Sequence, residues 1–159
     1  MKNSRYDFEE IQRKKPVGFI APTYVLFEGK EEEMLVEELC KTSFELGLET
    51  IAFNFCGDHV HVLLKSDTPV LSKMMMHWKG KASYNFNRKV NPNINDNHTI
   101  KTDGTKQALW AKSYFQKIVR TDEELKITIN YIRNNRKKHN LKPLSTNSIK
   151  LINNLLKKT

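Results

Sequence analysis

The sequence predicts an α+β sandwich, an antiparallel sheet with helices on one face and an extra C-terminal helix. The predicted elements follow one another as β-α-β-β-α-β-α, an order that this architecture accommodates well. A length of 159 residues with 38% hydrophobic residues suits one domain with a modest core. No repeat or linker divides the chain, so we expect residues 1–159 to form a single domain. Its expected extremities are a loosely attached polar stretch at 1–15 and the extra helix within 143–159.

Stretches rich in β-branched and aromatic residues predict the strands. Residues 17–27 are rich in β-branched and aromatic residues, which favour a strand. Residues 49–55 and 59–65 predict two more strands, joined by Cys56-Gly57-Asp58, which is a hairpin signal. Residues 107–119 are aromatic and β-branched enough for a further strand or pair of strands.

Apolar periodicity and capping residues predict the helices. Residues 31–46 begin with acidic side chains, the charge order that the helix dipole favours. Residues 69–89 predict a second, basic helix, and a capping box opens a third over 121–139. Residues 145–158 predict the short terminal helix. The stretch 90–104 is full of Asn, Asp and Pro without periodicity, so we expect a mobile loop there.

Charge is divided unevenly along the chain. The net charge is +9, but residues 1–64 carry a balance of −5 and residues 65–159 a balance of +14. A basic half favours a polyanionic partner, because each neutralised phosphate releases counterions and adds salt-sensitive affinity. We therefore expect a nucleic-acid partner; a generally basic surface kept soluble by charge is the alternative.

Composition disfavours several other classes of protein. No apolar run approaches the roughly 20 residues that a membrane-spanning helix needs, and the first ten residues lack the apolar stretch of a secretory signal. Cys40 and Cys56 lack the close spacing of a zinc ribbon or a redox pair. We expect a reduced, cytoplasmic domain with no membrane partner.

His59-Val60-His61 is the first candidate for chemistry. Residues two apart on a strand point to the same face, so both imidazoles project together while Val60 faces the core. Two such histidines can bind one metal ion when another element supplies a third ligand. Taken alone, the pair is more often two hydrogen-bonded surface histidines.

Tyr131 is the second candidate, on the third predicted helix. At 100° per residue, the apolar stripe of this helix consists of Leu125, Ile129 and Ile132, and Tyr131 borders that stripe. A tyrosine in this position can present its hydroxyl to a cleft, although an amphipathic residue with a wet tip is the commoner case. Asn135 lies one turn further along the same face, within reach of what Tyr131 touches.

Basic residues gather on the second and third predicted helices, with aromatic residues interleaved. Such surfaces suit single-stranded nucleic acid, whose bases have exposed faces for stacking. We predict nucleic-acid contacts from Lys73, Lys79, Lys81, Arg133, Arg136, Lys137 and Lys138. At least half of the interleaved aromatic residues are expected in the core instead.

Four motifs follow one another along the chain. FCGDHVHVLL at residues 55–64 is followed by LSKMM at 71–75 and LWAKSYF at 109–115. The fourth consists of DEEL at 122–125 with YIRNN at 131–135. In this order and spacing, the motifs resemble the single-tyrosine HUH transposases, which include insertion-sequence enzymes and REP-associated tyrosine transposases. The resemblance spans roughly residues 17 to 141.

The resemblance implies a ferredoxin-like (RRM-like) sheet and a metal-dependent DNA strand transferase. His59 and His61 would hold an Mg²⁺ or Mn²⁺ ion, and Asn135 falls where relatives place a polar third ligand, often Gln. Tyr131 would be the nucleophile and would act on single-stranded DNA at hairpin sites. Its attack on phosphorus would give a 5′-phosphotyrosine and a free 3′-hydroxyl. Because the bond energy is retained, another 3′-hydroxyl could rejoin the DNA without a nucleotide cofactor.

Two departures from the family pattern keep alternatives open. Asn135 is one methylene shorter than Gln, and Arg136 stands where a subgroup with Asn-Pro has proline. The alternative functions are a domesticated module that binds hairpin DNA without cleaving it, and an RNA-binding domain, which would prefer the 2′-hydroxyl. Both a monomer and a homodimer that exchanges tyrosine-bearing helices are compatible with the sequence.

Overall fold

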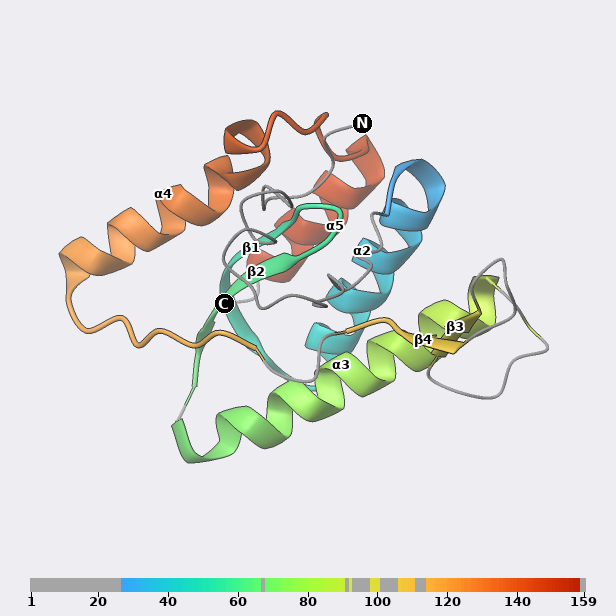
Figure 1. Cartoon of the computed structure of the whole chain (residues 1–159). Helices are drawn as coiled ribbons and strands as arrows, with labels where there is room; N and C mark the ends of the chain where they lie inside the picture. The colour runs from blue at the N-terminus through green and yellow to red at the C-terminus, as the bar shows by residue number, and fades with distance from the viewer. Residues whose placement is uncertain are drawn as a thin grey trace, which may run out of the picture.

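The computed structural model describes residues 27–66, 68–90, 92, 98–100, 106–110 and 114–157. Its elements in chain order are α2 (Gly29–Glu45), β1 (Glu49–Phe55), β2 (Val60–Lys65), α3 (Thr68–Val90), β3 (His98–Ile100), β4 (Lys106–Ala108), α4 (Asp122–Lys138) and α5 (Thr146–Leu156). Figure 1 shows a mixed α+β arrangement in which helices surround the β1–β2 ribbon. Within the described ranges, no helix is both long and apolar enough to cross a bilayer.

The β1–β2 hairpin confirms the two central predicted strands. The strands pair antiparallel, with Phe55 opposite Val60 and Asn54 opposite His61. Because side chains alternate along a strand, Phe55 and Val60 share one face while Asn54 and His61 share the other. The two faces of this ribbon therefore differ in character: one is apolar and the other carries polar groups.

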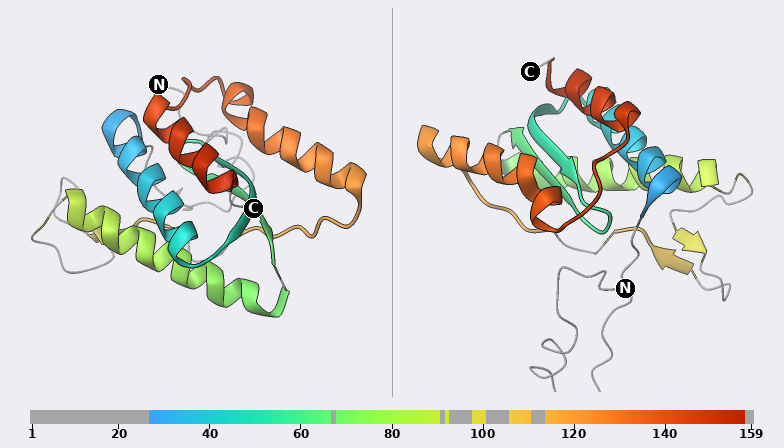
Figure 2. Two further views of the ribbon diagram at one scale, coloured as in Figure 1. Left: turned by 180° about the vertical axis from the view of Figure 1, so that it is seen from behind. Right: turned by 90° about the horizontal axis from the view of Figure 1, so that it is seen from above.

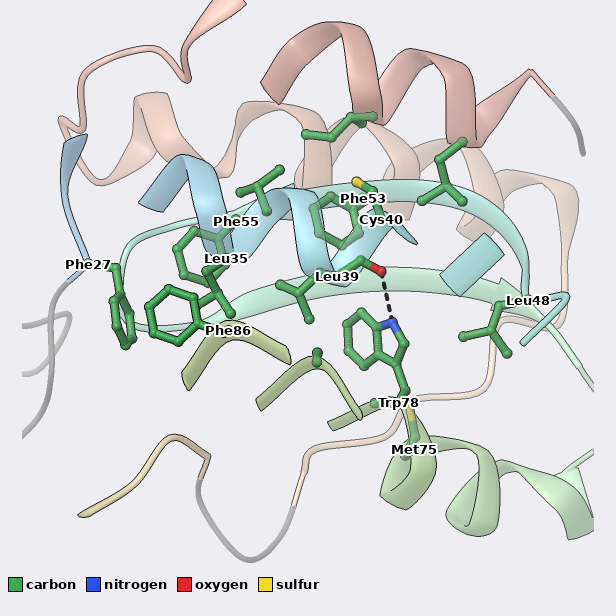
Figure 3. Close-up of a cluster of buried hydrophobic side chains, with 14 residues drawn as sticks. Phe27, Leu35, Leu39, Cys40, Leu48, Phe53, Phe55, Met75, Trp78 and Phe86 are labelled. Atoms are coloured by element: carbon green, nitrogen blue, oxygen red, sulfur yellow. Dashed lines mark hydrogen bonds between the residues drawn. The ribbon is translucent and has the colours of Figure 1, made fainter. Parts of the chain in front are cut away.

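The apolar face packs against three helices. Phe53 and Phe55 of β1 are buried with side chains from α2, α3 and α5 (Figure 3). Trp78 of α3 is 1% exposed, and its indole Nε1 donates to the carbonyl of Leu39 at 3.2 Å and to Ser43 Oγ at 2.8 Å. The core thus fills the space between the hairpin and α2, and the buried indole N–H is satisfied by α2.

The structure corrects the expectation that the helices lie on one face of the sheet. Figure 2 (right) shows α4 on one side of the β1–β2 ribbon, with α2 and α5 on the other. The physical reason lies in Asn54, whose side chain is on the face opposite the apolar one. Its Nδ2 donates to the carbonyl of Ile132 in α4 at 2.7 Å. A polar position on β1 therefore has a helix as its partner.

The predicted helices are confirmed with their capping residues. Gly47 follows α2 with φ of +63°, a conformation that glycine adopts without a steric penalty. The side chain of Thr121 accepts from the Glu124 amide at 3.2 Å, as the predicted capping box requires. Ser145 caps α5 in the same manner, by accepting from the Ser148 amide at 3.1 Å.

Two predictions in the middle of the chain need correction. A third prediction, near the N-terminus, lies outside the described residues. The expected mobile loop at 90–104 contains β3, which pairs antiparallel with β4. Of the strand or strand pair expected at 107–119, the structure shows β4, which ends at Ala108, and the described residues 109–110 and 114–120 have no regular secondary structure. Three-residue strands are too short for an alternation pattern to mark them. The predicted strand at 17–27 lies outside the described residues, apart from Phe27.

Candidate functional site

A tight turn sets the position of the histidine pair. Gly57 has φ of +78°, a left-handed conformation that glycine adopts without a steric penalty, and the amide of Asp58 closes the turn around it by donating to the carbonyl of Cys56 at 2.9 Å. The Cys56 amide donates to the carbonyl of His59 at 2.8 Å, so the ladder of hydrogen bonds continues up to the turn. His59 lies directly before β2 and His61 within it. Their ring centroids are 4.9 Å apart, so the two imidazoles lie side by side as predicted.

Two polar anchors hold α4 against this hairpin. The first is the bond from Asn54 to the carbonyl of Ile132. In the second, the guanidinium of Arg136 donates to Glu32 Oε1 at 2.5 Å and to the carbonyl of Phe55 at 2.8 Å. Its Nε also donates to a carbonyl of the segment that follows α4, at 2.9 Å. These bonds attach α4 to α2 and to the last residue of β1.

Residues at a spacing of four along α4 and its C-cap residue face the histidines. The ring of Tyr131 lies 5.4 Å from that of His61, centroid to centroid. One turn further along, Asn135 Oδ1 lies 3.3 Å from Nε2 of His59. Another turn along, the ring of His139 lies 5.5 Å from that of His59. The structure thus brings together Tyr131, Asn135, His59 and His61, which we call the His–Tyr site.

The phenol ring is open to solvent, whereas the amide is enclosed. Tyr131 is 44% exposed and Asn135 is 0% exposed. Besides its contact with His59, Asn135 Oδ1 accepts from Cys56 Sγ at 3.4 Å. Asn135 Nδ2 is buried and has no hydrogen-bond partner among the described residues. A substrate can therefore approach Tyr131 from outside, while the oxygen of Asn135 is directed into the site.

The donor set fits a divalent cation. It offers two imidazoles and an amide oxygen, and in octahedral coordination at about 2.1 Å neighbouring ligand atoms lie about 3.0 Å apart. The distance of 3.3 Å between His59 Nε2 and Asn135 Oδ1 is close to this spacing. The part of the chain that the structure describes contains no metal-binding group of three His, Cys, Asp or Glu residues. The shorter side chain of Asn135 reaches His59 because α4 is held close to the turn.

The predicted basic residues of α4 differ in their surroundings. Lys138 Nζ lies 5.2 Å from the ring centroid of Tyr131, beside the His–Tyr site. Arg133 and Lys137 are exposed. The Arg136 side chain is 11% exposed and is engaged by acceptors of the protein itself. Lys138, Arg133 and Lys137 are therefore available to a polyanion, while Arg136 is committed to anchoring α4.

The predicted basic residues of α3 belong to another part of the molecule. Lys73 is exposed, and burial lowers the pKa of Lys79. Lys81 Nζ lies 2.6 Å from Glu45 Oε2, and this contact lowers the pKa of the Glu45 carboxyl. Because α3 packs on the apolar face of the hairpin, the structure does not bring these lysines to the His–Tyr site.

Three further residues line the site. From the sequence, Asp58 is a turn residue, Cys56 a small buried residue and His139 a member of a basic run. In the structure Asp58 Oδ1 lies 2.5 Å from His59 Nδ1. The spacing of four from Tyr131 through Asn135 to His139 is the signal by which His139 could have been found.

Comparison with protein families gives one match over most of the chain. Residues 22–135 match the family described as Transposase IS200 like. The matched range includes both histidines, Tyr131 and Asn135. No curated protein and no solved structure gives a significant match.

Proposed function

The chain belongs to the IS200-like transposase family, and from this premise we propose that it cleaves and rejoins single-stranded DNA at hairpin sites through a covalent link to Tyr131. The observation that carries the proposal is the position of this tyrosine, 5.4 Å from His61 between ring centroids. The accessible phenol stands beside a set of donors suited to a divalent cation. That combination is what nucleophilic attack on a phosphodiester needs.

His59, His61 and Asn135 would hold an Mg²⁺ or Mn²⁺ ion. When bound, the ion would neutralise charge on the phosphoryl oxygens and orient the scissile phosphate. Asn54 and Arg136 keep α4 in place, so that Tyr131 stays beside these ligands. These two residues limit the motion of the phenol before the reaction. Less conformational entropy therefore has to be lost when the transition state forms.

The chemical step balances within the DNA and the tyrosine. The Tyr131 hydroxyl oxygen attacks phosphorus, a P–O bond forms to the tyrosine, and the P–O3′ bond breaks. The phenolic proton is lost and the departing oxygen takes up a proton, which leaves a free 3′-hydroxyl and a 5′-phosphotyrosine. Attack by another 3′-hydroxyl reverses the step, so no nucleotide cofactor is consumed.

The charges on α4 support a DNA substrate. Lys138 lies against the ring of Tyr131, and Arg133 and Lys137 are exposed on the same helix. Phosphate contacts from such side chains position a strand without reading its sequence. We propose a single strand as the substrate because Tyr131 needs an accessible DNA backbone for its attack.

We further propose that residues 17–27 complete a ferredoxin-like sheet within a single domain of residues 1–159. The Phe27 amide donates to the carbonyl of Gly57 at 3.0 Å, so Phe27 lies beside the turn before β2.

A groove of about 430 Å³ lies between residues 62–66 and residues 114–121. Consecutive residues of β2 line it, so it follows the strand's edge. A segment leading to Phe27 along this edge would run antiparallel to β2. Backbone NOEs between residues 17–26 and 62–66 would support this arrangement, and their absence would contradict it.

The function is tested with labelled hairpin oligonucleotides, Mn²⁺ and denaturing electrophoresis. We expect a covalent protein–DNA adduct that is lost in Tyr131→Phe. Tyr114→Phe is the matched control, because Tyr114 is another accessible tyrosine whose hydroxyl contacts Ser72 at 3.0 Å, away from the His–Tyr site. An adduct that persists in Tyr131→Phe would overturn the assignment of the nucleophile.

A module that binds hairpins without cleaving them is the second candidate. It is favoured by the complete burial of Asn135, whose amide oxygen already contacts Cys56 and His59 within the protein. Tight binding across a panel of hairpins without any adduct would support this candidate. A preference for RNA over DNA hairpins of equal sequence would support an RNA-binding domain instead.

A further inference from the structure

The carboxylate of Asp58 lies against the side of the His59 ring that faces away from Asn135. Asp58 Oδ1 is 2.5 Å from Nδ1 of His59, and the Asp58 side chain is 13% exposed. Asp58 follows Gly57 in the tight turn, and its own amide donates to the carbonyl of Cys56 at 2.9 Å. The carboxylate is therefore held on a short, hydrogen-bonded turn directly beside the ring.

The two neighbours of the ring decide which nitrogen carries the proton of the neutral imidazole. A proton on Nδ1 makes a charge-assisted hydrogen bond to the carboxylate of Asp58. A proton on Nε2 would instead donate to the neutral Asn135 oxygen at 3.3 Å and leave a lone pair facing a carboxylate at 2.5 Å. The shorter distance and the negative charge both favour the proton on Nδ1.

This tautomer leaves two acceptor atoms facing each other. Nε2 of His59 then presents a lone pair to Asn135 Oδ1, with 3.3 Å between the atoms. Rotation of the amide would place Nδ2 there, but in the structure the oxygen faces the ring and Nδ2 has no partner in the described part of the chain. Two lone pairs directed at one place form an arrangement that a bound cation stabilises.

We propose that Asp58 is a positioning residue of the site, whose carboxylate keeps the proton of His59 on Nδ1 so that Nε2 is free to bind a divalent cation beside Asn135. Metal-binding histidines commonly donate their second ring N–H to a carboxylate or carbonyl in this way. The metal part of this role rests on the function proposed above. The tautomer part stands on the contacts of Asp58 and Asn135 alone.

The test uses the full chain without DNA and two readouts. Long-range ¹H–¹⁵N correlation spectra, recorded at a pH where imidazoles are neutral, report the tautomer of His59. Titration with Mn²⁺, followed by electron paramagnetic resonance, reports metal affinity. The variants are Asp58→Ala and Asp58→Asn, and Glu49→Gln is the control because it removes an exposed carboxylate from the same hairpin.

We expect Nδ1–H in the wild type and loss of that preference in Asp58→Ala. Mn²⁺ affinity should fall about 10- to 100-fold in Asp58→Ala, the range seen for such outer partners. The fall should be smaller in Asp58→Asn, which keeps an acceptor oxygen, and absent in Glu49→Gln. An Nε2–H tautomer in the wild type, or unchanged Mn²⁺ affinity in Asp58→Ala, would overturn the role of Asp58. If the tautomer changes as expected but no chain binds Mn²⁺, the proposed metal function is overturned while the tautomer assignment holds.

Discussion

The imidazole of His61 and the phenol ring of Tyr131 lie edge to face, with centroids 5.4 Å apart and an interplanar angle of 78°. β2 carries the first residue and α4 the second, with α3 and the β3–β4 hairpin between them in the chain. Folding therefore joins a predicted metal ligand to a predicted nucleophile. Because the two residues belong to different elements, each role can be removed without deleting the other.

Replacement of His61 by alanine should separate cleavage from binding. We expect adduct formation with Mn²⁺ to fall by at least about 100-fold, because the phosphate loses its electrophilic activation. Affinity for the hairpin should stay within about threefold, because phosphate electrostatics dominates it. Adduct rates and fluorescence anisotropy measure the two quantities. His77→Ala, on the exposed surface of α3, is the control. Normal cleavage by His61→Ala would show that His61 is not a ligand.

Asn135 and its neighbour Asn134 offer a matched pair. Asn135 is fully buried beside His59, whereas Asn134 is exposed and its Nδ2 donates to the carbonyl of Asn130 at 2.9 Å. We expect Asn135→Ala to lower Mn²⁺ affinity at least about tenfold, the scale on which even outer partners of a metal act. Asn134→Ala should leave it unchanged. Equal affinities in a Mn²⁺ titration of both variants would remove Asn135 from the ligand set.

Arg136 should matter for stability more than for binding. Its guanidinium and the carboxylate of Glu32 are 11% and 12% exposed, and it also donates to the carbonyl of Phe55. Removal of one partner of such a pair leaves a charge without compensation, so Arg136→Met should cost about 2–4 kcal/mol in the free energy of unfolding. Urea denaturation measures this loss. The exposed Lys137→Ala should stay within about 0.5 kcal/mol of the wild type. A similar small effect in Arg136→Met would mean that the anchor is dispensable.

Lys137 and Lys138 should contribute to the salt dependence of DNA binding. Each phosphate contact adds about one to the slope of log K against log salt, so the double alanine variant should lose about two. Hairpin binding is measured at several salt concentrations between about 50 and 200 mM, and the slope is taken from the plot of log K against log salt. The control is the double variant Lys150→Ala/Lys157→Ala, which has the same net charge as the α4 variant. It changes exposed residues at α5, on the other side of the β1–β2 ribbon from α4. An unchanged slope in the α4 variant would take these lysines off the binding surface.

Much of the fold follows from local signals. The hairpin at Gly57, the cap at Thr121 and the end of α2 at Gly47 each depend on residues within one turn, and all three are confirmed. The side of the sheet on which α4 lies depends on Asn54 and Ile132, which are distant in sequence. A polar residue inside an apolar strand is a signal that a partner exists, but it does not identify that partner.

The site was predictable to the same extent. His59 and His61 share a face because of strand periodicity, and Tyr131 and Asn135 because of helical periodicity. The distance between the two pairs depends on how α4 docks, which no local pattern encodes. For the same reason Arg136 could be counted among the basic residues but not assigned to Glu32, its partner across the fold.

The anchors of α4 also predict that one chain suffices for the reaction. Asn54 and Arg136 tie the helix that carries Tyr131 to the strand next to the histidines of the same chain. A mixture of Tyr131→Phe and His61→Ala chains should therefore form no adduct, because neither chain contains both the phenol and the complete donor set. In a homodimer that exchanges these helices, half-sites from the two variants would combine and activity would return. Wild-type protein diluted into the double variant His61→Ala/Tyr131→Phe is the control, since the adduct formed per wild-type chain should stay constant if each chain works alone and fall if helices are exchanged.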